Sequence, residues 1–244
     1  MKQERQDFRE RFIDRRDFLK QSASGAASLL VAASGLFWRS KQAQAAEATT
    51  TVQPLKPEAA LQKLMVGNQR FRQHHPQYPD QSAARLQAVS QAQHPFATIL
   101  SCADSRVPVE LIFDQGVGDI FDVRIAGNIA TPEVIGSIEY AIVLLDTPVL
   151  MVLGHERCGA VTAAVNSEVL PGAISNLVKA ILPAIEPHKG ATADLIDTAV
   201  MANVRYQIAQ LKRSPLLTER LQAGTLKIVG GRYDLDAGSV TLLT

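Results

Sequence analysis

Two short segments that lie far apart in the chain contain residue types that bind soft metal ions. Cys102 precedes Asp104 and Arg106 at spacings of two and four residues, and His155 is followed three residues later by Cys158. Two thiols and one imidazole are typical zinc ligands, and a set of three protein ligands leaves the fourth tetrahedral position for water or substrate. The chain has only two cysteines, so this set uses both. The pattern predicts a catalytic zinc site rather than a closed structural one.

Other interpretations of these residues stay open at this point. Free cysteines are often buried as small apolar side chains, and the histidine would then be an ordinary core residue. Alternatively, Cys102 and Cys158 pair as a disulfide, as cysteines do in oxidising compartments. Asp104 and Arg106 could form a local ion pair that caps a helix starting near Pro108. We favour a catalytic dyad, in which Arg106 holds the carboxylate bidentately beside the metal and keeps it ionised.

The pattern of apolar residues predicts the strands and helices that must bring these residues together. Short runs rich in β-forming residues predict strands over 97–102, 120–125, 149–153 and 226–229, with an edge strand at 240–243. Apolar residues at helical spacing predict helices over 57–75, 131–145 and 191–211. This alternation predicts an α/β fold with a mainly parallel central β-sheet flanked by helices and an N-terminal helical arm.

The predicted order of elements places the candidate ligands together. Cys102 ends the first predicted strand, and His155 and Cys158 follow the third. In open parallel sheets, sites form outside the carboxyl ends of the strands. We therefore expect the two segments to meet at one edge of the sheet.

The first 45 residues have the features of an export signal. Arg15 and Arg16 begin a twin-arginine-like motif, a mildly apolar run covers 22–38, and an A-x-A type cleavage site ends at Ala45. We expect a cleaved twin-arginine signal peptide at 1–45, a flexible lead-in at 46–56, a single domain at 57–244 and a periplasmic location, with the twin-arginine translocase as the partner during export. A single membrane anchor is the alternative, although the Ser and Gly content of the run disfavours it.

Charge is distributed unevenly along the chain. Residues 1–45 contain nine Lys or Arg and five Asp or Glu side chains. Residues 46–244 contain sixteen Lys or Arg and nineteen Asp or Glu side chains, which gives this part of the chain a net charge of −3. A segment with this net negative charge is not suited to bind nucleic acid.

The two ligand segments and their surroundings resemble the β-class carbonic anhydrases. The motifs are Cys-x-Asp-x-Arg at 102–106 and His-x-x-Cys at 155–158, and flanking matches occur at 93–96, 107–110, 136–140, 159–160 and 229–235. The resemblance covers about residues 57–244.

This resemblance implies a function and a set of site residues. The activity would be reversible hydration of CO2 to bicarbonate and a proton, with zinc-bound hydroxide as the nucleophile and the Asp104–Arg106 dyad orienting it. One Zn²⁺ per chain would be held by Cys102, His155 and Cys158. Family positions that bind substrate would correspond to Gln93, Phe121, Tyr140 and Gly159. In the family such residues can come from a neighbouring subunit, so the expected assembly is a homodimer or a higher homo-oligomer.

The sequence departs from the family at one regulatory position. Some members have a bicarbonate-binding inhibitory site that uses a tryptophan three residues before the first cysteine ligand, and Ile99 occupies that place here. Regulation of that kind is not expected.

Two rival functions stay open. One rival is a relative that hydrolyses CS2 or COS with the same zinc ligands. The other is an exported, non-enzymatic protein with a disulfide between its two cysteines.

Overall fold

The computed structural model describes residues 55–185 and 195–243, which all belong to one compact unit of the chain. The predicted signal peptide at 1–45 and all but two residues of the lead-in lie outside the described residues. Among the residues described, no helix is long and apolar enough to span a membrane.

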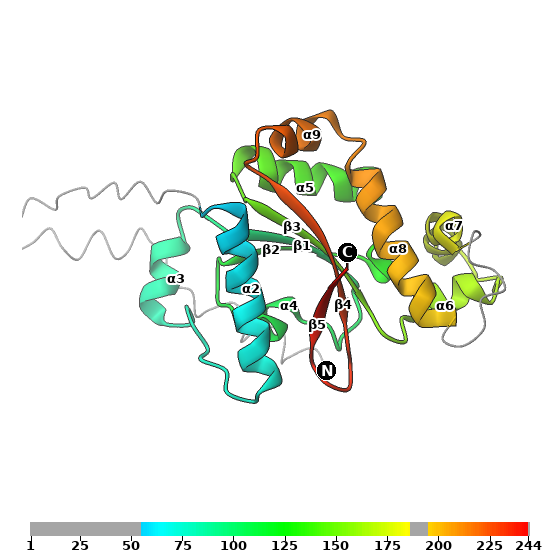
Figure 1. Ribbon diagram of the computed structural model, residues 1–244, viewed down its shortest axis with the longest axis horizontal. Helices are drawn as coiled ribbons and strands as arrows, with labels where there is room; N and C mark the ends of the chain where they lie inside the picture. The colour runs from blue at the N-terminus through cyan, green and yellow to red at the C-terminus, as the bar shows by residue number, and fades with distance from the viewer. Residues whose placement is uncertain (1–54, 186–194, 244) are drawn as a thin grey trace, which may run out of the picture. The chain divides into compact units, whose positions relative to one another are not determined.

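A five-stranded sheet runs through this unit in the order β2-β1-β3-β4-β5 (Figure 1). The strands are β1 (Ala97–Ser101), β2 (Ile120–Arg124), β3 (Val149–His155), β4 (Lys227–Tyr233) and β5 (Val240–Leu243). The first four are mutually parallel, and β5 pairs antiparallel with β4. Because β2 lies on one side of β1 and β3 on the other, the connections diverge at the carboxyl ends of β1 and β3. Such a switch point is where open α/β sheets form their sites.

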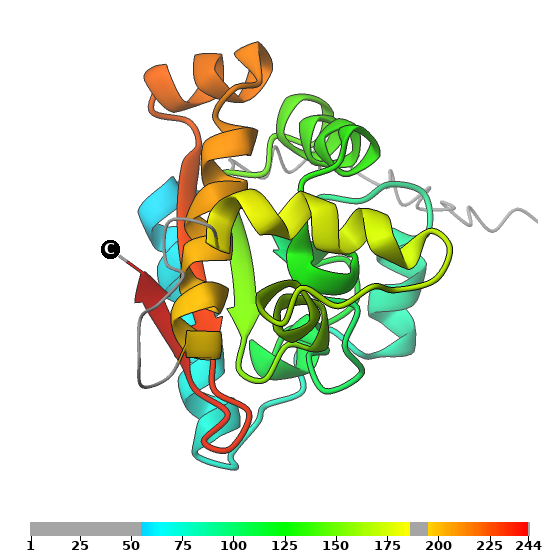
Figure 2. The ribbon, with the colours of Figure 1, turned by 90° about the vertical axis from the view of Figure 1, so that its right-hand side faces the viewer.

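Helices cover both faces of the sheet (Figures 1 and 2). They are α2 (Pro57–Arg72), α3 (Ala83–Val89), α4 (Val109–Ile112), α5 (Pro132–Leu144), α6 (Gly159–Val165), α7 (Ile174–Ile185), α8 (Leu195–Leu211) and α9 (Pro215–Gln222), with a 3₁₀ turn η1 at Ala126–Asn128.

Alternation of side chains along the strands assigns the helices to the two faces. Ile99 and Met151 pack in one core cluster with residues of α2 and α4, whereas Leu100, Leu150 and Val152 pack in another with residues of α5, α8 and α9. β1 and β3 are buried along their whole length, as expected for central strands covered on both sides.

One glycine brings α8 close to the end of β3. A Cβ atom at Gly154 would lie 2.7 Å from the Val204 side chain and 2.9 Å from that of Val200. The absence of a side chain at this position therefore allows α8 to pack directly against the strand that ends at His155.

The predicted fold class is confirmed, with some differences in the bounds of elements. β3 extends through His155, so this residue ends the strand instead of following it. The first helix ends at Arg72 rather than near residue 75. Thr131 caps α5, since its hydroxyl accepts a hydrogen bond from the Val134 amide. The predicted helix at 191–211 is observed from Leu195, and residues 191–194 lie outside the described residues. The sequence analysis did not predict α3, α6, α7 or α9.

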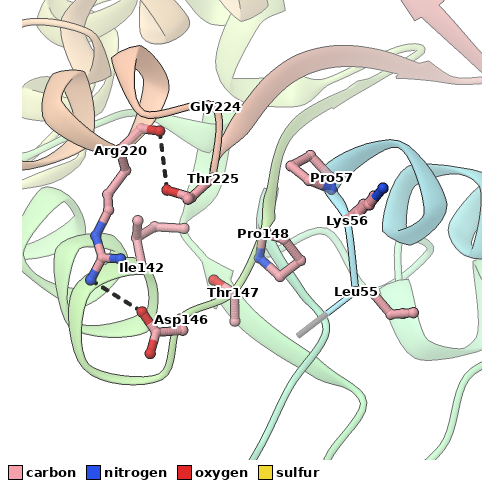
Figure 3. A pocket seen from close by; sticks show the side chains of 10 residues that line it. All are labelled: Leu55, Lys56, Pro57, Ile142, Asp146, Thr147, Pro148, Arg220, Gly224 and Thr225. Carbon is pink, nitrogen blue, oxygen red and sulfur yellow. Dashed lines mark hydrogen bonds and ion pairs between the residues drawn. The ribbon is translucent and has the colours of Figure 1, made fainter. Parts of the chain in front are cut away.

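One pocket lies at the amino end of β3, at the opposite end of this strand from His155 (Figure 3). It has a volume of about 390 Å³ and is bordered by Pro57, Thr147, Pro148 and Arg220, among other residues. Arg220 forms an ion pair with Asp146 at 3.1 Å on one side of it. This pocket is separate from the residues predicted to do chemistry.

Candidate metal centre and active site

The structure brings Cys102, His155 and Cys158 together at the switch point. Their sulfur and ring-nitrogen atoms all lie within 4.8 Å of one another. All three side chains are buried, with 4% or less exposed, and the two cysteines are not joined in a disulfide. Cys102 directly follows β1, His155 ends β3 and Cys158 directly precedes α6, so the divergence of the chain at this edge assembles the cluster.

The ring of His155 is held in the orientation that a metal ligand needs. Its Nδ1 lies 2.8 Å from the carbonyl oxygen of Glu156, which can only accept, so Nδ1 carries the proton. The other nitrogen, Nε2, is buried and has no hydrogen-bond partner among the described residues. A buried nitrogen lone pair without a donor is costly to leave unsatisfied. This pattern of one ring nitrogen anchored and the other aimed at the cluster is that of a metal-ligating histidine.

The surroundings of the two sulfurs favour negative charge. The Gly127 amide donates to the Cys102 sulfur at 3.3 Å, and Cys158 is the N-cap of α6, whose first amides point towards it. The hydrogen bond from the Cys158 thiol lowers the pKa of Cys102 far below its usual value, while burial opposes this, and the same hydrogen bond raises the pKa of Cys158.

Asp104 and Arg106 form a close ion pair next to the cluster. Arg106 Nε donates to Asp104 Oδ1 at 2.9 Å and Nη2 to Oδ2 at 2.7 Å, and the Arg106 amide also donates to Oδ1 at 2.9 Å. These hydrogen bonds hold the pKa of Asp104 well below its usual range. Asp104 Oδ2 lies 3.8 Å from His155 Nε2, so an ionised carboxylate oxygen borders the space between the candidate ligands.

Arg124, at the end of β2, fixes the loop that carries these residues. Its Nε donates to the carbonyl oxygen of Cys102 at 3.1 Å and its Nη2 to that of Asp104 at 2.6 Å. The backbone on both sides of Ala103 is thus tied to the neighbouring strand.

A charged network fixes the segment that follows His155. Arg232, in β4, contacts Glu156 Oε1 at 2.5 Å and Asp197 Oδ1 of α8 at 2.5 Å, and the Leu235 amide donates to Glu156 Oε2 at 3.1 Å. The backbone carbonyl oxygen of Glu156 also accepts the hydrogen bond from His155 Nδ1. The orientation of the imidazole therefore depends on ion pairs from two other elements.

The structure does not gather the four predicted substrate residues around the cluster of the same chain. Gln93 is exposed and precedes β1, at the amino end of a strand whose carboxyl end carries Cys102. Phe121 lies on β2 at the level of Thr98, three residues or ~10 Å from the end of the strand. Its ring and that of Tyr140 on α5 have centroids 6.2 Å apart. Gly159 alone adjoins the cluster, directly after Cys158.

Several residues that support the site were missed by sequence reasoning. They are Arg124, Gly127, Glu156, Asp197, Asn203, Gln207 and Arg232. Asn203 and Gln207 did give a signal, because they place amide side chains among the apolar residues of the predicted helix at 191–211. Glu156 and Arg232 lie within the segments that match the family, at 155–158 and 229–235, but no role was assigned to them. Arg124, Gly127 and Asp197 gave no signal, since their partners are distant in sequence.

The residues present fit a zinc ion. Two buried sulfurs that receive amide hydrogen bonds and one buried imidazole nitrogen without a partner match the donor set and the deprotonation state that zinc requires. A second group of ligand types, Glu156, Asp234 and Asp236, is paired with arginines instead.

Comparison with known proteins relates this chain to an enzyme family. Residues 97–240 match the family model described as carbonic anhydrase. The chain is 41% identical to carbonic anhydrase 2 of Mycobacterium tuberculosis over 191 residues, which cover 76% of this chain and 92% of that protein. It is also 41% identical to a carbonic anhydrase of Mycolicibacterium smegmatis, at 76% and 93% coverage.

Solved structures give the same result. The β-carbonic anhydrase CcaA is 31% identical with a TM-score of 0.61, covering 75% of this chain and 95% of that one. The β-carbonic anhydrase CafA of Aspergillus fumigatus is 25% identical with a TM-score of 0.62, covering 76% and 89%. The chain belongs to the β-class carbonic anhydrase family and is an enzyme of that family.

Proposed function

We propose that this protein catalyses the reversible hydration of CO2 to bicarbonate and a proton, with one zinc ion per chain held by Cys102, His155 and Cys158. The observation that carries this proposal is the buried His155 Nε2, which has no hydrogen-bond partner within residues 55–185 and 195–243 and lies within 4.8 Å of two buried sulfurs in a chain of the carbonic anhydrase family. When bound there, zinc would supply a hydroxide nucleophile by lowering the pKa of a water, as it does in the carbonic anhydrases that use three histidines.

In this proposal Asp104 orients the nucleophile. An ionised carboxylate can only accept hydrogen bonds, so Asp104 Oδ2 would accept a hydrogen bond from the O–H of the attacking hydroxide and direct its lone pair away from the carboxylate. Arg106 has two tasks. It keeps Asp104 ionised, and its planar fork prevents the carboxylate from turning towards the proposed zinc site.

Space for a small substrate adjoins the cluster at Gly159. A Cβ atom placed at Gly159 would meet no atom within 4 Å. CO2 lying there would be next to Cys158. Phe121 would form an apolar wall, Tyr140 would help to bind the substrate, and Gln93 would donate a hydrogen bond to the substrate oxygen that gains charge.

We propose that these three residues reach the site from a second copy of the chain, in a homodimer. In support, β2 is an edge strand whose outer side pairs with no other strand of the described residues. Tyr140 and Leu144, on the helix next to it, are 46% and 65% exposed. An apolar surface beside an unpaired strand is typical of a subunit interface.

The proposed function is tested by metal analysis, thiol titration under denaturing conditions and a stopped-flow CO2 hydration assay on the purified protein. We expect one zinc and two free thiols per chain, and activity that a chelator removes and zinc restores. A chain with no zinc and no free thiols would instead be the disulfide-linked, non-enzymatic alternative. Sulfide release from CS2, assayed in parallel, identifies the rival hydrolase if it exceeds CO2 hydration.

We further propose that the enzyme is exported by the twin-arginine route and acts in the periplasm. The proposal rests on the sequence of residues 1–45. N-terminal sequencing of the protein recovered from the periplasmic fraction should begin near Ala46, and recovery of only the uncleaved chain in the cytoplasm would contradict it.

A further inference from the structure

Two amide side chains on α8 connect this helix to the loop beside Cys102. Asn203 and Gln207 are four residues apart, so they lie on the same face of the helix, and they are 0% and 2% exposed. Asn203 Nδ2 donates to the carbonyl oxygen of Gly127 at 2.9 Å, and Gln207 Nε2 donates to Asn203 Oδ1 at 2.9 Å. Both contacts are buried.

The direction of every hydrogen bond in this chain of contacts is determined. The Ala130 amide can only donate, and it donates to Gln207 Oε1 at 2.9 Å. Gln207 must therefore present its NH₂ group to Asn203, which accepts through Oδ1. Asn203 must in turn present its own NH₂ group to Gly127. No amide can be flipped without breaking two hydrogen bonds.

Gly127 transmits this constraint to the metal centre. Its carbonyl oxygen is held by Asn203, and its amide donates to the Cys102 sulfur at 3.3 Å. The residue has φ +75°, and a Cβ atom would lie 2.6 Å from Ile181 Cδ1, so only glycine fits this conformation. Fixing the carbonyl side of Gly127 fixes the direction of its N–H group.

We propose that Asn203, oriented by Gln207, is a positioning residue of the metal centre: it holds the Gly127 amide against the Cys102 sulfur and so sets the charge that this thiolate offers to the metal. The inference rests on the proposed zinc site. A thiolate that accepts a hydrogen bond is a weaker electron donor to its metal than one that does not. Such outer contacts orient ligands and tune the metal.

The molecule offers a matched control for a purely structural role. Asn68, on α2, is 4% exposed and donates to the carbonyl oxygens of Ile112 and Gly238 at 3.1 and 2.9 Å, while its Oδ1 accepts from the Val240 amide. Asn68 is thus a buried helix asparagine clamped to backbone in the same way. Its partners, however, lie in other elements and do not contact the cysteines.

The experiment compares Asn203→Asp and Asn68→Asp with the wild-type enzyme. Each change replaces a buried NH₂ donor by a carboxylate oxygen of the same shape, so both should lower the melting temperature. Zinc affinity is measured by competition with a chromophoric chelator, and the sulfur-to-cobalt charge-transfer band is recorded after substitution with Co²⁺. Asn203→Asp should weaken zinc binding by roughly 10- to 100-fold, because the Gly127 amide no longer holds the Cys102 sulfur in place, and it should shift the band to lower energy, because the thiolate becomes a stronger electron donor. Asn68→Asp should leave both unchanged.

A milder variant covers the case in which Asn203→Asp does not fold. Gln207→Met keeps the volume of the side chain but no longer orients Asn203, and it should shift both readouts in the same direction by a smaller amount. Wild-type affinity and an unshifted band in whichever of the two variants folds would overturn the positioning role while leaving the zinc site intact. A wild-type protein that takes up neither zinc nor Co²⁺ would overturn the proposed function and this inference together.

Discussion

At the scale of single residues, the site combines two requirements that conflict in most protein interiors. The two cysteines are buried among apolar residues of α6, α7 and α8, and His155 is fully buried, yet a metal site needs charged sulfur. Backbone amides at Gly127 and at the start of α6 offset the cost of that charge. Asp104, in contrast, stays partly exposed and depends on Arg106 for its ionisation.

The first prediction concerns this dyad. Asp104→Asn keeps the size of the side chain but removes the negative charge and one of the acceptor oxygens. We expect the variant to retain zinc and to lose roughly 100-fold or more of kcat, which is typical for a group that handles a proton in the reaction. Stopped-flow CO2 hydration and metal analysis on the same sample measure both quantities.

Asp236→Asn is the matched control for the dyad. Asp236 is also held by two hydrogen bonds from one arginine, Arg157, both at 2.9 Å, but it is not part of the Cys102–His155–Cys158 cluster. The control should keep wild-type kcat. If Asp104→Asn retains zinc and turns over at a near wild-type rate, Asp104 takes no part in the chemistry.

At the scale of elements, one buried carboxylate joins α2 to the segment after α4. Asp114, 3% exposed, contacts Arg70 of α2 at 2.5 Å and accepts hydrogen bonds from the amides of Gln77 and Tyr78 at 2.9 and 3.0 Å. Burial raises the pKa of Asp114, but these amides and Arg70 outweigh it, and the pKa lies below its usual value.

The second prediction follows from the sign of that shift. Because the folded state binds this proton less tightly than the unfolded state, Asp114 stabilises the fold above its unfolded pKa of about 3.9, and the contribution is lost as pH falls below that value. Asp114→Asn should lower the free energy of unfolding at pH 7 by about 1–3 kcal/mol. The difference between variant and wild type should shrink as the pH approaches 3. Urea unfolding at several pH values measures it.

The exposed pair of Glu58 with Lys227 provides the control for Asp114. These groups are 3.5 Å apart and mostly solvated, so Glu58→Gln should change stability little at any pH, as exposed ion pairs do. An Asp114→Asn difference that stays constant from pH 7 to pH 3 would show that the carboxylate charge is not what stabilises this contact.

At the scale of the whole molecule, the proposed active site is composite. Cys102 and Gln93 lie at opposite ends of β1 in one chain, whose five residues span ~17 Å. A substrate touching both therefore needs Gln93 from another copy. This is a question of assembly rather than of fold.

The third prediction tests this arrangement by mixing two inactive variants. Asp104→Asn and Gln93→Ala should each be slow as homodimers. After the mixture is dissociated and reassembled, half of the dimers would be mixed, each with one complete site. About a quarter of the wild-type activity should return if each site draws from both copies of a twofold dimer. Stopped-flow assay of the reassembled mixture measures the recovery.

The mixing experiment is interpreted together with the oligomeric state of the wild type and of two variants. Light scattering should give twice the mass of one chain for the wild type, and Leu144→Asp should reduce it, because Leu144 lies on the proposed interface. Val169→Asp, at a residue that is 100% exposed between α6 and α7, is the control and should keep the dimer. Absence of any recovery in mixtures that contain mixed dimers would show that no site combines Asp104 of one copy with Gln93 of the other.

Much of the fold could be predicted from local pattern. The strands at 97–102 and 149–153 are mostly apolar because both faces of a central parallel strand are buried, and Thr131-Pro132 marks the start of α5 because capping is a local interaction. The helices that were missed gave weaker signals. α6 has seven residues and begins with Gly159, and α7 contains Pro183.

The sequence by itself determined the identity and spacing of the candidate metal donors and of the proposed dyad, because Cys-x-Asp-x-Arg and His-x-x-Cys are local patterns with few alternative uses. Only the tertiary structure decided how these donors are held. Arg124, Arg232 and Asn203 act on residues 20 to 76 positions away through backbone carbonyls and a carboxylate. Such partners leave no periodicity in the sequence, because they exist only once the sheet and α8 have packed.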